Sequence, residues 1–155
     1  MLVSTASSLA SAIGRGLAAG AIGTAAMTVS SSIEAKLSDR GASTAPADAA
    51  KKVLQVETPN DEAEAHFSNL VHWGYGTAWG AAHGVLGELG LSGKNATLAH
   101  LALVWGSEQV VLPSLDVAPP VWESGAKATA TDLFHHLVYA TATGLAYEML
   151  DKPRN

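Results

Sequence analysis

The sequence predicts an all-α protein, an integral membrane four-helix bundle built from two helical hairpins. Two observations lead to this fold class: charge is scarce, and the uncharged residues fall into four long segments. Charged residues make up 15% of the 155 residues, against about 25% in typical soluble domains. Of the 23 Asp, Glu, Lys and Arg residues, 11 lie between Glu34 and Glu64. The rest of the chain is therefore nearly free of charge, which is typical of membrane spans.

A spanning helix needs about 20 mostly apolar residues, and four stretches meet this length. We therefore expect a single transmembrane domain over residues 1–155. Its predicted spans are about 12–33, 66–88, 95–115 and 129–150, with a polar linker at 34–65.

The first predicted span is rich in small residues. Residues 16–33 read GLAAGAIGTAAMTVSSSI, without a charge. The polar linker follows, and within it Ser43 and Thr44 precede Pro46, which is a helix-start signal. We expect a short surface helix over about 47–54.

The second predicted span combines glycine with large rings, since residues 72–84 read HWGYGTAWGAAHG. Gly76, Gly80 and Gly84 repeat every four residues, which leaves a groove along one side of a helix. Helices in lipid associate by close contact, and small residues permit it. A soluble bundle is the alternative, but each interior glycine costs a soluble helix about 1 kcal/mol relative to alanine.

The third and fourth predicted spans each carry one notable feature. Glu108 is the only charge in residues 95–115, and a charge at a span centre costs about 2.5 to 3.5 kcal/mol. We therefore expect Glu108 to be protonated, to lie near an interface or to face a partner helix, with Arg15 as a candidate partner. In the fourth span Gly144 provides another packing position. Three prolines between these spans predict a structured turn.

An internal repeat links the second and fourth spans. HWGYGTAWG at 72–80 aligns with HLVYATATG at 136–144, a spacing of 64 residues. This match predicts two hairpins whose second helices run in the same direction, with His72 and His136 at the same depth.

Five ionisable residues within the predicted spans are candidates for function, because such residues usually face the bundle interior. These intramembrane polar candidates are His72, His83, His100, Glu108 and His136. No His-x-x-x-His or Glu-x-x-His pair strengthens a metal site. There is no serine nucleophile elbow, phosphate loop or dinucleotide fingerprint. We therefore expect no catalytic residue, cofactor or metal, and a protein that is not an enzyme.

The remaining composition excludes other classes of partner and chemistry. The chain has no cysteine, which excludes disulfides and thiolate chemistry. Its net charge is −5 without a basic tract, which argues against nucleic acid. The expected partners are the lipid bilayer and either further copies of the chain or a larger membrane complex.

One stretch resembles a known family. LAHLALVWGSEQVVLPSLDVAPPVW, followed by TDLFHHLVYATATGLAYE, is similar to the YagU-type small bacterial inner-membrane proteins, a family of unknown function. The resemblance covers about residues 96–150 and includes His100, the three prolines, Asp132 and His136. It implies a multi-pass protein of the bacterial inner (cytoplasmic) membrane, and no established activity.

Three functional hypotheses follow. The first is a small membrane protein without enzymatic activity, serving as an accessory or oligomeric structural component. The second is a transporter or a proton- or ion-conducting element that uses His100 and Glu108. The third is a haem- or metal-binding membrane protein with His72 and His136 as ligands. A water-lined cavity that reaches Glu108 would favour the second, and a dry interior would favour the first.

Overall fold

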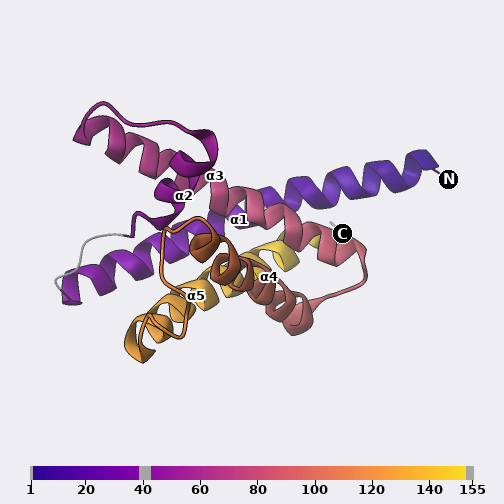
Figure 1. Cartoon of the computed structure of the whole chain (residues 1–155). Coiled ribbons are helices and arrows are strands. Elements are labelled where there is room, and N and C mark those ends of the chain that lie inside the picture. The colour runs from indigo at the N-terminus through magenta and orange to yellow at the C-terminus, as the bar shows by residue number, and fades with distance from the viewer. Residues whose placement is uncertain (1, 39–42, 153–155) are drawn as a thin grey trace.

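The computed structural model describes the backbone of residues 2–38 and 43–152 and the side chains of 6–38 and 43–152 (Figure 1). The five helices in these residues are α1 (Leu2–Ser38), α2 (Ala45–Leu54), α3 (Asp61–Glu88), α4 (Gly93–Ser114) and α5 (Ala126–Asp151). No strand occurs in the part of the chain that is described, and the all-α prediction is confirmed.

The helix ends differ from the predicted span ends because polar residues extend the helices. The side chain of Asn60 accepts a hydrogen bond from the Ala63 backbone N–H at 2.9 Å, which starts α3 before the apolar stretch. Three acidic residues then occupy the first turn of α3, where the helix dipole favours negative charge. Helix α2 carries a proline in its first turn and ends at Gln55, whose φ of 55° stops the helix.

Helix α1 packs closely on α3, and the two run antiparallel. Thr28 contacts His72 toward one end of the pair, and Ser8 bonds Glu88 toward the other. Between these points the backbones nearly touch: a Cβ placed on Gly80 would lie 2.6 Å from the Cα of Gly20. Only glycine on both sides allows this separation.

Helix α5 lies against both α1 and α4. Ser30 bonds His135, and Arg15 pairs with Asp151, so α5 is antiparallel to α1. Since α3 is also antiparallel to α1, helices α3 and α5 run in the same direction. Val104 of α4 packs on Tyr139 and Ala140 of α5 in one buried cluster.

Helix α2 is held by its two lysines. Lys51 pairs with Glu64 of α3 at 2.8 Å, and Lys52 donates to the backbone oxygen of Asp116 at 3.0 Å. The short helix therefore ties the start of α3 to the turn after α4, at one end of the long helices (Figure 1).

The distribution of side chains is unusual for a water-soluble fold. The largest fully buried side chains are His100, Thr24 and Thr143, and the buried apolar residues are mostly alanine. Large apolar side chains instead lie on the outer surface of the four long helices, among them Ile22, Leu70, Leu98, Val110, Phe134 and Leu145.

One segment of the described chain, Ala6–Ser38, is long and apolar enough to cross a membrane. Core helices of soluble proteins and signal sequences can share that length and composition. The other three predicted spans are less apolar and do not meet the same standard, so four spans stay a prediction.

Candidate functional site

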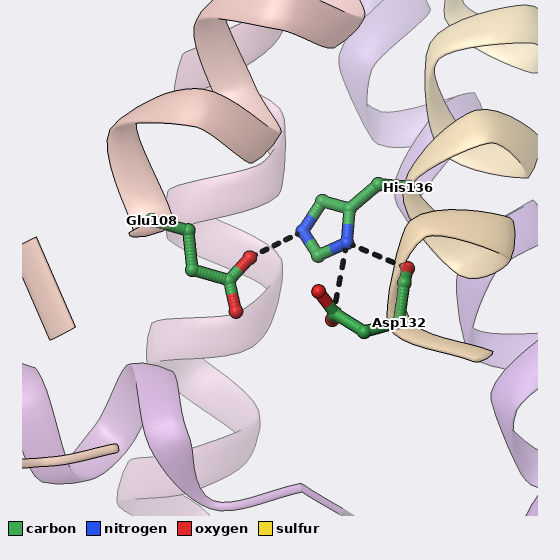
Figure 2. Close-up of side chains that lie close together, drawn as sticks. All are labelled: Glu108, Asp132 and His136. Carbon is green, nitrogen blue, oxygen red and sulfur yellow. Dashed lines mark hydrogen bonds and ion pairs between the residues drawn. The ribbon is translucent and has the colours of Figure 1, made fainter. Parts of the chain in front are cut away.

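A buried histidine joins two carboxylates between α4 and α5. The Nε2 atom of His136 lies 2.8 Å from an oxygen of Glu108, and its Nδ1 lies 3.3 Å from an oxygen of Asp132. Figure 2 shows the imidazole ring set between the two acids. We call Glu108, Asp132 and His136 the acid–histidine cluster.

The helices position this cluster in two ways. Asp132 and His136 are four residues apart on α5 and share one face of that helix. Glu108 reaches them from α4, the antiparallel neighbour. Trp105, one turn before Glu108, donates its indole N–H to the second oxygen of Asp132 at 2.7 Å. The indole thereby fixes the orientation of the Asp132 carboxylate.

Both ring nitrogens of His136 face oxygens that can only accept. Nε2 faces a carboxylate, and Nδ1 faces both the Asp132 carboxylate and the Asp132 backbone carbonyl, the latter at 3.0 Å. Two donors are needed, and only the protonated imidazole has two N–H groups. In this arrangement His136 therefore carries a positive charge between two negative ones.

The cluster has the donor types and spacing of a metal site. One ligand atom from each of the three residues lies within 4.8 Å of the other two. His136 is 9% exposed, whereas 22% of the Glu108 side chain and 38% of the Asp132 side chain are exposed. The carboxylates are thus open on one side.

A histidine pair, His83 and His100, lies between α3 and α4. His100 is fully buried, and its Nε2 lies 3.1 Å from the backbone oxygen of Trp79. A carbonyl oxygen only accepts, so Nε2 carries the hydrogen and Nδ1 of a neutral His100 is free to accept. The Nδ1 of His83 is 3.3 Å away and donates to it. A neutral His83 then presents an unprotonated Nε2.

A cavity of about 280 Å³ adjoins His83 of this histidine pair at the α3–α4 turn. His83 lines it together with Tyr147 and Glu148 of α5. The rings of His83 and Tyr147 are 5.2 Å apart. Neither His100 nor Glu108 is among the residues that line this cavity.

The remaining candidate histidine, His72, has a simpler environment. Its Nε2 lies 2.9 Å from the hydroxyl of Thr28 on α1. His135, next to the acid–histidine cluster in sequence, faces α1 instead, with Nδ1 2.8 Å from the hydroxyl of Ser30. These two contacts attach α3 and α5 to the same stretch of α1.

The structure groups the predicted polar residues differently from the functional hypotheses. It joins Glu108 with His136 and His83 with His100, and it gives His72 a partner apart from both groups. The expected pairing of Arg15 with Glu108 is wrong, because Arg15 reaches Asp151 at 2.9 Å. Arg15 lies near the opposite end of the helices from Glu108.

The predicted packing glycines lie at helix contacts. Gly80 and Gly84 face the α1 backbone, Gly76 faces Thr24, and Gly144 faces Thr97 of α4. Trp105 and His135 were not predicted as polar partners, and Asp132 was predicted only through the family resemblance. The spacing of four between Asp132 and His136 was the available signal, since it puts both on one helix face.

Comparison with protein-family models, curated proteins and solved structures gave no match for this chain. The resemblance to YagU-type proteins stays a prediction.

Proposed function

We propose that this chain is a small multi-span protein of the bacterial inner membrane, without enzymatic activity, that serves as an accessory or oligomeric structural component. The observation that carries the proposal is the reversed distribution of side chains. The interior is mostly histidine, threonine, alanine and glycine, with Val104, Leu112, Tyr139 and Tyr147 as its larger apolar side chains, while many leucine and valine side chains and Phe134 face outward.

The exposed fractions make the argument quantitative. Leu70 is 72% exposed, Val110 65% and Phe134 54%. Burying such a side chain is worth about 1.5 to 3 kcal/mol in water, so a water-soluble fold has reason to turn these residues inward. In the hydrocarbon of a bilayer an outward-facing leucine carries no such cost, because lipid tails are as apolar as leucine. A bilayer around the four long helices accounts for all of these residues together.

The interior supports the same conclusion. Without a hydrophobic drive between helices, association depends on backbone contact and interhelical hydrogen bonds. The contact of Gly20 with Gly80 supplies the first. The hydrogen bonds of His72 to Thr28 and His100 to the Trp79 backbone supply the second. These contacts hold the long helices together, which favours a structural role.

Cysteine labelling tests the proposal directly, because the chain has no cysteine of its own. Leu103→Cys and Leu137→Cys are at outward positions in the middle of α4 and α5, and Glu57→Cys is on the loop before α3. In native membranes a charged maleimide should label Glu57→Cys, from whichever side it faces, and leave the other two unlabelled until detergent is added.

A carbonate wash provides the independent check. The protein should stay in the membrane pellet, because four spans hold it there. Quantitative release into the supernatant, or labelling of Leu103→Cys and Leu137→Cys in intact membranes, would rule out the multi-span proposal and restore the soluble bundle.

A proton- or ion-conducting element is the second candidate, favoured by the cavity that His83 lines and by the His83–His100 pair behind it. It ranks second because this cavity is not lined by Glu108, the residue that the hypothesis needs. Proton flux into vesicles that contain the purified protein tests it. Flux that His100→Ala abolishes would place conduction ahead of the structural role.

A further inference from the structure

We propose that Glu108, Asp132 and His136 bind a divalent transition-metal cation. This inference does not depend on the structural role proposed above. It rests on three observations: the spacing of three ligand atoms on two helices, an indole that orients one ligand, and two carboxylates that face neither lysine nor arginine among the described residues.

The spacing fits one ion. Zinc lies about 2.0 to 2.2 Å from imidazole nitrogen and carboxylate oxygen, so two ligands on one ion are roughly 3 to 3.6 Å apart in tetrahedral or octahedral geometry. In the acid–histidine cluster the Glu108–His136 distance is 2.8 Å, and every pair of ligand atoms lies within 4.8 Å. An ion binds only one nitrogen of His136, so the carboxylate that faces the other nitrogen must rotate around the ring to join it.

Trp105 supports the Asp132 ligand from outside the site. Its indole N–H bonds one carboxylate oxygen of Asp132, while the other oxygen faces His136. Hydrogen bonds of this kind hold metal-binding carboxylates in place and affect affinity by about 10- to 100-fold. The indole of Trp105 thus holds one oxygen of Asp132 in place and leaves the other oxygen available to bind a metal ion.

The charge of the site favours a cation. In the part of the chain that the structure describes, the ion pairs of Glu108 and Asp132 are with His136, and neither acid pairs with lysine or arginine. The two carboxylates bring two negative charges to one place, and no lysine or arginine of the described residues lies against them to offset these charges. A divalent cation bound by both carboxylates and a neutral imidazole makes the site neutral.

The site lies toward one end of the helices, and its carboxylates are partly exposed. Glu108 lies roughly 10 Å along α4 from Leu115, at 1.5 Å per residue, and Asp132 lies in the second turn of α5. The lysine of α2 that bonds Asp116 marks the same end. Both carboxylates are partly exposed and lie nearer to the end of the helices where α2 and the α4–α5 turn lie.

The donor set selects the class of metal. One imidazole nitrogen with two carboxylates suits Zn²⁺, Mn²⁺ or Fe²⁺. Ca²⁺ needs six to eight oxygen ligands, and Mg²⁺ is bound mainly by oxygen and water. Three protein ligands also leave open coordination positions on the ion. Zn²⁺ and Mn²⁺ are therefore the probes of choice.

Metal titration of the full-length protein in detergent, after chelator treatment, tests the site. Isothermal titration with ZnCl₂ and with MnCl₂ should show one ion per chain. Glu108→Gln combined with Asp132→Asn should weaken binding at least 100-fold. Trp105→Phe should weaken it about 10-fold, since the indole only orients Asp132. Circular dichroism and gel filtration establish that each variant is folded.

Two matched controls identify the site. Glu88→Gln removes one carboxylate at the other end of α3 and should leave binding unchanged. His66 and Glu62 form an exposed pair on α3 that can attract zinc without a built site. Binding that is lost in His66→Ala and retained in folded Glu108→Gln/Asp132→Asn overturns the proposal. Two further results would overturn it. One is that the wild-type protein binds no metal at 1 mM. The other is that neither Trp105→Phe nor Glu108→Gln/Asp132→Asn changes the affinity.

Discussion

The hydroxyl of Tyr139 on α5 donates a hydrogen bond to the backbone carbonyl oxygen of Gly76 on α3, at 2.6 Å. Gly76 has no side chain to shield its carbonyl, so the phenol can reach it. The residue that aligns with Tyr139 in the internal repeat is Tyr75, the neighbour of Gly76. Tyr139 is 2% exposed and Tyr75 48% exposed. The two aligned tyrosines therefore have different environments.

We expect Tyr139→Phe to lower the thermal stability of the protein in detergent. The change deletes one buried hydroxyl and leaves the ring, and losing such a bond costs about 1 to 3 kcal/mol. Tyr75→Phe is the matched control, because it removes the same atom from an exposed position. Melting curves followed by circular dichroism provide the comparison. Equal melting temperatures for the two variants would show that the bond to Gly76 contributes nothing.

Two glycines of the same helix should respond in opposite ways to alanine. A Cβ on Gly80 would lie 2.6 Å from the Gly20 Cα, whereas nothing lies within 4 Å of a Cβ on Gly74. Gly80→Ala should therefore separate α1 from α3 and lower the folded yield. Gly74→Ala should be neutral, or stabilising by up to about 1 kcal/mol from helix propensity. If Gly80→Ala is tolerated as well as Gly74→Ala, the close contact of α1 with α3 is wrong.

His136→Ala should cost more stability than His72→Ala in metal-free protein. Removing His136 leaves two carboxylates without their partner, and breaking a buried ion pair costs about 3 to 5 kcal/mol. Removing His72 loses one bond to Thr28, worth about 1 kcal/mol. Chemical or thermal unfolding in detergent measures both changes. A larger loss for His72→Ala would contradict the assignment of the ion pairs to His136.

The attachment of α2 should loosen in acid. The hydrogen bond from Lys51, followed by that from Thr58, lowers the pKa of Glu64 below its ordinary 4.5. A lowered carboxyl pKa gives stability that is present above the ordinary value and is lost as the pH falls through the lower folded value. The hydrogen bond to Glu64 also raises the pKa of Lys51 above its ordinary 10.5. That contribution is present below 10.5 and is lost as the pH rises through the higher folded value.

A spin label on Val53→Cys, an exposed position of α2, reports this loosening. Its mobility should be low and constant between about pH 4.5 and 10.5 and should rise below pH 4.5. Adding Glu64→Gln should remove most of the acid transition, because the pair with Lys51 is then absent. An unchanged acid transition in that variant would assign the loosening to other carboxylates.

Part of the fold could be predicted from local properties of the sequence. Long stretches with little charge predicted the four long helices, because an uncharged stretch of about 20 residues is typical of a helix. The short α2 followed from its Ser-Thr-Ala-Pro start. The true start of α3 was missed by five residues, because the Asn60 cap precedes the apolar pattern on which the prediction depended.

The sequence by itself determined the helical class and the positions of the small residues. It also determined that polar groups recur along the helices and that Asp132 and His136 share one helix face. Periodicity specifies the face of a residue on its own helix. It does not specify the rotation and height of the neighbouring helix, which depend on how side chains of both helices fit. The tertiary structure therefore decided that Glu108 meets His136, that His83 meets His100 and that Arg15 meets Asp151.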